Sequence, residues 1–239
     1  MTLKVLDLFS GIGGFSLGFE RAGMETVAFC EYEEHAQKIL RKHWPDVPIY
    51  KDVRTLDGKQ FRGSVDVVCG GFPCQPHSTA GRRNASSDDR DMWQDTARLV
   101  REVQPQYCVF ENVRGLLTSE SGWYFAEVLF DLSEAGYVVE WFVIPAATVG
   151  APHLRERVWI IAYSDEAQLK RGRISGRIQE EYSNAGYTRW GKDKPGVERT
   201  SNGIPFQMDR LGRLGNAVVP QIPELIGKAI IKHATGQSS

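Results

Sequence analysis

Short apolar runs alternate with amphipathic stretches along the first two thirds of the chain. Runs rich in Val, Ile, Tyr and Phe are typical of buried strands, and they cover residues 4–9, 26–30, 65–69, 107–110, 137–143 and 157–163. Helical stretches fall between the first five runs and near the C-terminus, over residues 14–22, 33–43, 92–103, 122–135 and 221–233. This alternation predicts an α/β fold with a mostly parallel sheet and helices on both faces. No helical pattern separates the last two runs, which predicts a terminal antiparallel pair.

The chain changes character after residue 163 and is polar and rich in Gly and Arg as far as residue 201. Between Lys170 and Lys194, seven Lys and Arg against three Asp and Glu give a net charge of +4. Tyr182, Tyr187 and Trp190 are interleaved with these charges. A solvated, irregular loop would have this composition. A small nucleic-acid-contacting insert would have the same composition, because its cations bind phosphates and its aromatic rings stack on bases.

Composition narrows the class of protein. The chain has 239 residues, 41% of them hydrophobic, which fits one large domain with a sizeable core. The net charge of −1 does not indicate nucleic-acid binding by the whole chain, but it is compatible with a local basic surface. No apolar run reaches the length of a membrane span and the start of the chain does not read as a signal peptide, so we expect no membrane association and a cytoplasmic location. The four cysteines form no Cys-x-x-Cys pair, so we expect no metal site.

Two loops at predicted strand ends suggest chemistry. Cys74 follows the Val-rich run 65–69 in a Gly-Gly-Phe-Pro-Cys sequence, and a glycine-rich turn, residues 10–14, follows the first run. In open α/β sheets, ligands bind at the carboxyl ends of the strands. The turn does not match the dinucleotide fingerprint Gly-x-Gly-x-x-Gly. A ligand loop followed by a cysteine nucleophile nevertheless indicates group transfer.

Charged residues lie at other predicted strand ends. Glu31 is placed to accept hydrogen bonds from a ribose diol, and Asp52 to accept one from an amino group. Glu111 could hold or protonate a ring nitrogen if burial raised its pKa. Arg155 and Arg157 alternate on one predicted strand and should share a face. Taken singly, each acid also fits a turn or helix cap, and the arginines also fit a charged surface strand.

Five motifs occur together in one order. They are Asp7-Leu8-Phe9-Ser10-Gly11-Ile12-Gly13-Gly14, Gly71-Phe72-Pro73-Cys74-Gln75-Pro76, Glu111-Asn112-Val113, Arg155-Glu156-Arg157 and Gly215-Asn216-Ala217-Val218. In this order they closely resemble the DNA (cytosine-5)-methyltransferase family, in a compact bacterial or bacteriophage form. The resemblance covers about residues 5–163 and 214–231. It implies a Rossmann-like S-adenosylmethionine-dependent methyltransferase fold with a small irregular target-recognition insert. We therefore expect a catalytic and cofactor-binding domain over residues 1–163, a target-recognition region over 164–205 and a returning segment over 206–239.

The resemblance also implies roles for single residues. Cys74 matches the nucleophile, Glu111 the acid that meets N3 of cytosine, and Arg155 and Arg157 the pair that positions the base and Glu111. The residues implied to bind S-adenosylmethionine, which becomes S-adenosylhomocysteine, are Phe9, Ser10, Gly11, Ile12, Gly13, Gly14, Glu31, Tyr32, Asp52, Val53, Pro73, Asn216 and Val218. The expected DNA contacts are Gln75, Ser78, Arg82, Arg83 and Arg90, with Lys170, Arg171, Arg173 and Arg177 of the basic segment.

The implied activity is methyl transfer to C5 of a flipped cytosine in double-stranded DNA. His153 and His77 stand where the family usually has glutamine and phenylalanine, and neither change removes a core catalytic group. The variable region is short, so we expect a brief or weakly read target, or the need for an accessory specificity protein; a cognate restriction endonuclease is the other partner considered. A cytosine-5 tRNA methylase shares the same motifs. A silent cofactor-binding module is disfavoured because Cys74 and Glu111 are both present.

Overall fold

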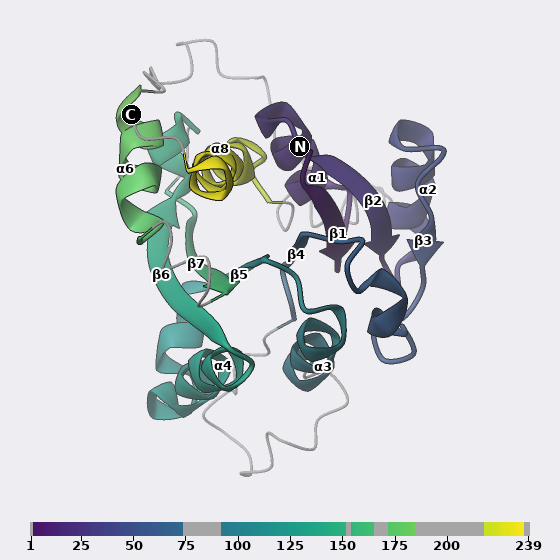
Figure 1. The fold of residues 1–239 in the computed structure, drawn as a ribbon, viewed down its shortest axis with the longest axis horizontal. Coiled ribbons are helices and arrows are strands. Elements are labelled where there is room, and N and C mark those ends of the chain that lie inside the picture. Colours follow the sequence, from purple (N-terminus) through teal and green to yellow (C-terminus); the bar gives the residue numbers. More distant parts are fainter. Residues whose placement is uncertain (1, 74–91, 152–153, 165–171, 185–217, 237–239) are drawn as a thin grey trace, which may run out of the picture.

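The part of the chain that the structure describes forms one mixed seven-stranded sheet (Figure 1). The computed structural model describes residues 2–73, 92–151, 154–164, 172–184 and 218–236. The strands are β1 (Lys4–Leu8), β2 (Glu25–Cys30), β3 (Ile49–Tyr50), β4 (Val67–Gly70), β5 (Tyr107–Val113), β6 (Tyr137–Pro145) and β7 (Glu156–Ser164). Their order across the sheet is β3-β2-β1-β4-β5-β7-β6. β7 runs antiparallel to both β5 and β6, and the other neighbouring pairs are parallel.

Helices cover both faces of this sheet. The α-helices are α1 (Gly14–Ala22), α2 (Glu34–His43), α3 (Trp93–Val103), α4 (Trp123–Glu134), α6 (Ser175–Asn184) and α8 (Gln221–Thr235). Short 3-10 segments are η1 (Gly58–Phe61), η3 (Arg114–Gly122) and η4 (Ala146–Val149). α1, α6 and α8 lie on one face, and α3 and α4 on the other (Figure 1). The sequence-based prediction of a mostly parallel α/β sheet with a terminal antiparallel pair is confirmed.

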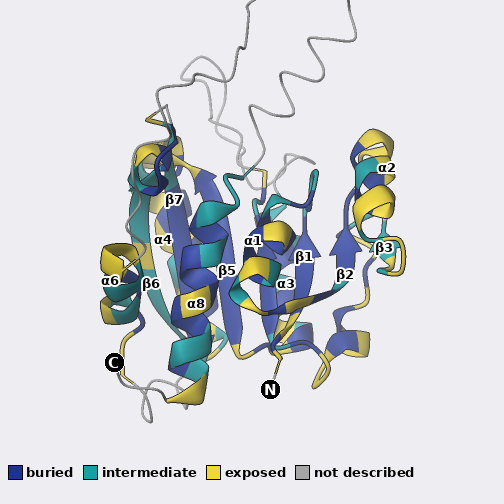
Figure 2. Cartoon of the chain, turned by 90° about the horizontal axis from the view of Figure 1, so that it is seen from above, coloured by how far each residue is buried: buried dark blue, intermediate teal, exposed yellow. Residues whose placement is uncertain are grey.

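The strands form because their side chains are buried on both faces. In β1, Val5 packs into the cluster under α1 and α8, whereas Leu6 and Leu8 pack into the cluster under α3 and α4. Figure 2 shows the central strands buried along most of their length, with exposed residues mainly on the outer sides of the helices and in the loops. Near-continuous apolar runs are what parallel strands covered on both faces require.

The register aligns the carboxyl ends of three strands. Leu8 pairs with Cys30 of β2 and with Gly70 of β4, so β1, β2 and β4 end at one level. β1 lies between the strand that follows it in sequence and β4, so the connections leave in opposite directions from this point. In open α/β sheets, such a switch point opens a crevice for ligands.

Two strand boundaries differ from the sequence-based prediction. β5 was expected to end at residue 110, but it continues to Val113 because β7 pairs with its last residues, Glu111 opposite Trp159 and Val113 opposite Arg157. Glu111 therefore lies within a strand rather than after one. β7 begins at Glu156, one residue before the predicted run 157–163. Arg155 still precedes the strand, so it does not alternate with Arg157 along it.

Part of the polar region after β7 is helical, which differs from the irregular segment expected from the sequence. α6 begins directly after Ile174, and Ile174 and Ile178, four residues apart, are buried in the cluster that contains α8. Lys232 of α8 pairs with Glu180 and Glu181 at 2.9 Å and 2.8 Å. Buried Ile174 and Ile178 together with these ion pairs dock α6 against α8. The division into segments 1–163, 164–205 and 206–239 stays a prediction.

Buried polar groups fix α6 and α8 to the amino-terminal edge of β5. His233 lies between the Tyr107 hydroxyl, at 2.9 Å from Nδ1, and the Gly172 carbonyl oxygen, at 3.0 Å from Nε2. Since a carbonyl oxygen only accepts, Nε2 carries the proton and Nδ1 accepts from Tyr107. Glu140 of β6 accepts from the Ile174 backbone N–H at 2.9 Å. Residues 172–184 are therefore anchored at the edge opposite the aligned carboxyl ends.

A buried carboxyl group joins β1 to α1. Asp7 is fully buried, and its Oδ2 accepts a hydrogen bond of 2.7 Å from the Ser16 hydroxyl of α1. The Cys69 thiol of β4 also lies against this carboxyl group. Burial raises the pKa of Asp7 to about 7, although the hydrogen bond from Ser16 opposes the shift.

Stability should therefore depend on pH through Asp7. Folding raises its pKa from 3.8 to about 7, so its contribution to stability is fully present below about pH 4 and is lost as the pH rises through 7. We expect Asp7→Asn to remove a dependence of at most about 1.4 kcal/mol per pH unit. Urea unfolding between pH 4 and pH 8 measures it. An identical pH slope in the variant and the parent protein would contradict this assignment.

The docking of α6 is testable by truncating its apolar anchor. Ile174 has no exposed surface, so Ile174→Ala should lower the free energy of unfolding by about 2–5 kcal/mol. Tyr182→Ala, on α6 itself with a 41% exposed side chain, is the control and should change it by less than about 0.5 kcal/mol. Equal, small effects of the two variants in urea unfolding would show that α6 is not docked.

Candidate active site

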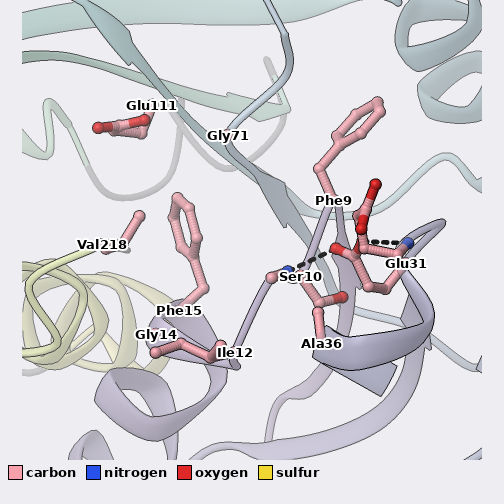
Figure 3. Close-up of a pocket in the computed structure, with 12 residues that line it drawn as sticks. Phe9, Ser10, Ile12, Gly14, Phe15, Glu31, Ala36, Gly71, Glu111 and Val218 are labelled. Atoms are coloured by element: carbon pink, nitrogen blue, oxygen red, sulfur yellow. Dashed lines mark hydrogen bonds between the residues drawn. The ribbon is translucent and has the colours of Figure 1, made fainter. Parts of the chain in front are cut away.

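A cavity of about 410 Å³ opens at the switch point (Figure 3). Its volume falls within the range of small-molecule sites. Its walls come from the loop after β1, the start of α1, the loop after β2, α2, the end of β4, β5 and the segment before α8. The lining residues are Phe9, Ser10, Gly11, Ile12, Gly14, Phe15, Glu31, Glu33, Ala36, Gly71, Glu111 and Val218. Eight of the residues predicted from the sequence therefore share one cavity.

The glycine turn after β1 adopts a conformation that needs small residues. Gly11 and Gly13 have φ of 54° and 86°, in the left-handed region. The Gly13 backbone N–H donates to the Ser10 carbonyl oxygen at 2.8 Å. A Cβ on Gly14 would lie 2.7 Å from the Val218 carbonyl oxygen. The missing side chain thus allows the segment before α8 to approach the turn and close the cavity wall.

Phe9 is the unusual member of this turn. It is not a glycine, yet its φ is 51°. A bulky side chain in the left-handed region carries backbone strain, which is found mainly where function requires it. Figure 3 shows the Phe9 ring beside Glu31 at one end of the cavity.

Glu31 ties the loop after β2 to the glycine turn. Its Oε2 accepts from the Gly11 backbone N–H and its Oε1 from the Glu33 backbone N–H, each at 2.7 Å. The side chain is 8% exposed. An ionised carboxylate offers about four acceptor sites, so Glu31 retains acceptor capacity toward the cavity.

Glu111 occupies the other end of the cavity (Figure 3). Its Oε1 lies 2.9 Å from Nε of Arg157. Burial raises the pKa of Glu111, and the positive charges of Arg157 and Arg155 oppose this shift. A Cβ on Gly71 would lie 3.2 Å from Glu111 Oε2, so glycine leaves the acid room. Both arginines therefore act electrostatically on Glu111, although only Arg157 is part of β7.

The next residue of β5 anchors the backbone that leads to Cys74. Asn112 is buried, and its Nδ2 donates to the Phe72 carbonyl oxygen at 2.9 Å. The Phe72 ring packs against Trp93 and Phe110, with centroid distances of 5.1 Å and 6.2 Å. The chain two residues before Cys74 is thus fixed by both a hydrogen bond and aromatic packing.

Several predicted cofactor contacts do not line the cavity. Tyr32 is 60% exposed, with the Lys51 ammonium 5.7 Å from its ring centroid. Asp52 pairs with Arg54 through both carboxylate oxygens, and the hydrogen bonds from Arg54 lower the pKa of Asp52. Val53 packs into the core under α3, and Pro73 is exposed.

Some predicted site residues lie elsewhere or outside the described residues. Arg173 and Arg177 belong to the segment anchored at the opposite edge, so the structure does not bring them to the cavity. Those outside the described residues are Cys74, Gln75, Ser78, Arg82, Arg83, Arg90, Lys170, Arg171 and Asn216, together with His77 and His153.

Sequence reasoning did not single out four lining residues, namely Phe15, Glu33, Ala36 and Gly71. The sequence could have indicated Gly71, because a glycine just before a cysteine loop allows another group to approach the backbone closely. Phe15 and Ala36 look like ordinary core positions of amphipathic helices, and only the placement of α1 and α2 reveals them. Glu33 precedes α2, and its backbone N–H binds Glu31.

Two further observations concern the described part of the chain. It contains no group of three or more His, Cys, Asp or Glu side chains arranged to hold a metal ion. Among its helices, none combines the length and the apolar character needed to cross a bilayer.

Comparisons with known sequences point to one family. A sequence model described as C-5 cytosine-specific DNA methylase matches residues 3–204. The chain is 36% identical over 167 residues to the type II methyltransferase M.NgoMIV of Neisseria gonorrhoeae, covering 70% of the chain and 53% of that protein. It is 38% identical over 165 residues to the type II methyltransferase M.Eco47II of Escherichia coli, covering 68% and 40%. The chain thus spans about half the length of such relatives.

Solved structures share the fold. A putative DNA modification methyltransferase encoded within an E. coli prophage superposes with a TM-score of 0.60 at 29% identity, covering 70% of this chain and 48% of that one. The S. pombe Dnmt2 methyltransferase gives a TM-score of 0.57 at 17% identity, covering 98% and 97%, and this likeness concerns the fold alone. The predicted Rossmann-like methyltransferase fold is confirmed. Because the family match extends over most of the sequence, the chain belongs to the C-5 cytosine-specific DNA methylase family.

Proposed function

We propose that this chain transfers a methyl group from S-adenosylmethionine to C5 of cytosine in double-stranded DNA, with Cys74 as nucleophile. The observation that carries the proposal is the arrangement of one cavity with Glu31 and the glycine turn at one end and the Glu111–Arg157 pair at the other. The first end suits a nucleoside, and the second suits a pyrimidine ring. Methyl transfer requires a donor and a base to meet in this way.

The donor end has matching chemistry. S-adenosylmethionine supplies a methyl group activated by its sulfonium charge. Glu31 accepts from the ribose hydroxyls, and the turn at Gly11–Gly14 allows its backbone to approach the cofactor closely. Val218 and Phe15 provide apolar wall between the two ends. Tyr32, Asp52 and Val53 surround the adenine in this proposal, for which Asp52 must exchange a bond from Arg54 for one from the adenine amino group.

The base end activates cytosine, whose C5 is a poor nucleophile. The Cys74 thiolate forms a bond to C6 while Glu111 protonates N3, so the ring electrons shift toward C5. C5 then takes the methyl group from the sulfonium, which leaves as S-adenosylhomocysteine. C5 loses its proton to a base, the C6–S bond breaks to release the thiolate, and N3 returns its proton to Glu111. Burial raises the pKa of Glu111, which favours its proton-donating form over that of an exposed carboxyl group. Arg157 holds Glu111 at 2.9 Å, and Arg155 lies close enough to stabilise its charge.

The proposed substrate and cellular setting rest on the similarity to named relatives rather than on the geometry of the cavity. The relatives M.NgoMIV and M.Eco47II are named type II methyltransferases, which favours DNA. A paired base must be flipped into the cavity, since C6 is inaccessible in the stack. The proposed setting is the cytoplasm of a bacterial cell or a phage-infected host. An accessory specificity protein is a proposed partner, because the region available for target recognition is short. A cognate restriction endonuclease is the other proposed partner.

The first test is transfer of labelled methyl from S-adenosylmethionine to duplex DNA, run beside tRNA. We expect label in DNA, and none with Cys74→Ala, because removing the nucleophile blocks addition to C6. Cys108→Ala, at a buried cysteine of β5, is the matched control and should keep activity. Label in tRNA alone would move the assignment to RNA. Cofactor binding without transfer to either substrate would contradict autonomous catalysis by this chain.

A second test addresses the acid. Glu111→Gln keeps the side-chain size but removes the proton donor, so kcat/KM should fall about a hundredfold or more. The dissociation constant for S-adenosylhomocysteine should change little, because Glu111 and Glu31 lie at opposite ends of the cavity. Steady-state methylation and calorimetric titration measure the two quantities. Unchanged kcat/KM would remove Glu111 from the mechanism.

A further inference from the structure

An aromatic ring supports the glycine turn from outside the cavity. Trp44 directly follows α2, and its backbone N–H caps that helix by donating to the Leu40 carbonyl oxygen at 2.7 Å. Its indole N–H reaches across to α1 and donates to Glu20 Oε1 at 2.6 Å. The ring packs edge to face on Phe29 of β2, with centroids 5.3 Å apart. Three elements of the domain thus meet at one side chain.

The ring lies where a side chain on Gly13 would have to go. A Cβ at this position would approach Cη2 and Cζ3 of Trp44 to 2.6 Å and Cδ2 of Leu40 to 3.2 Å. Gly13 is also the N-cap of α1 and has a φ of 86°. Real Cβ contacts are essentially never this short, so the indole and Gly13 are packed as closely as a glycine permits.

The two helices joined by Trp44 contribute opposite parts of the cavity wall. α1 follows the glycine turn and carries Phe15, whereas α2 carries Ala36 (Figure 3). Trp44 itself does not line the cavity. A side chain in this position acts on a ligand only through the backbone that it supports.

We propose that Trp44 is a positioning residue for the methyl donor: its indole holds Gly13, and with it the turn over Ser10–Gly14, in the shape that the cofactor binds. The inference rests on the proposed function, because it assumes that the cavity binds S-adenosylmethionine. The Glu20 hydrogen bond fixes the orientation of the indole, and Phe29 supports its other side.

A double-mutant cycle tests the contact between Trp44 and Gly13. The dissociation constant for S-adenosylhomocysteine is measured by calorimetry for the parent protein, Gly13→Ala, Trp44→Ala and the double variant. We expect Trp44→Ala to weaken binding about tenfold and Gly13→Ala to weaken it more, since it adds a clash. In the Trp44→Ala background, Gly13→Ala should cost about fivefold less than in the parent. The strain of alanine at positive φ is present in both backgrounds and cancels.

Kinetics separate positioning from general stability. With Trp44→Ala, KM for S-adenosylmethionine should rise about tenfold while kcat at saturating donor stays within about twofold. Trp123→Ala, at a 76% exposed tryptophan of α4 on the other face of the sheet, is the control and should change neither value. Should Trp44→Ala fail to fold, the same cycle with Trp44→Phe replaces it, because phenylalanine also withdraws the ring atoms nearest to Gly13.

The outcomes are distinct. Non-additive binding with a raised KM supports the inference. Additive effects, or normal binding by Trp44→Ala with only a lowered melting temperature, overturn it and leave the proposed function standing. Failure of the parent protein to bind S-adenosylhomocysteine would overturn both.

Discussion

The level ending of β1, β2 and β4 is the constraint on which the site depends. Parallel register places Leu8 beside Cys30 and Gly70, so the chain leaves all three strands at one edge. The glycine turn, Glu31 and Gly71 then meet at this edge, where the Gly11 backbone N–H donates to Glu31. β5 contributes Glu111 because it extends beyond the end of β4 and pairs there with β7. A shift of one residue in any of these pairings would turn the side chains to the other face and move the loops apart.

Three carboxyl groups near this edge differ in their burial and in their hydrogen-bond and charge partners. Asp7 lies beneath it, fully buried with one hydroxyl donor, and its pKa rises to about 7. Glu31 accepts hydrogen bonds from two backbone N–H groups, which fix the position of its carboxylate. Glu111 is buried but faces two guanidinium groups, so burial and charge oppose each other. Only Glu31 and Glu111 line the cavity, so the edge presents a fixed acceptor at one end of the cavity and an acid paired with arginine at the other.

How far the sequence predicts this structure depends on where each element gets its partners. The strands and α1 were predictable because their apolar residues follow the periodic patterns of buried strands and of an amphipathic helix. The extension of β5 through Glu111 was not, since it comes from pairing with β7, more than forty residues later. α6 was missed because only two isoleucines among polar neighbours mark its buried face. The position of Asp52 after a strand could be predicted from the sequence, but its hydrogen bond from Arg54 could not. The placement of Glu31 and the glycine turn at the cavity could be predicted because each directly follows a predicted strand.

The contact between Gly14 and the Val218 carbonyl group joins two segments that leave the ribosome far apart in time. The glycine turn is synthesised first, yet the wall of the cavity is completed only when the segment before α8 has emerged and docked. Until then one face of the sheet lacks the cover of α8 and the cavity lacks the wall that Val218 provides. Maturation of the site is thus coupled to completion of the chain, and a polypeptide whose synthesis stops before Val218 would carry the catalytic motifs without the pocket that brings them into use.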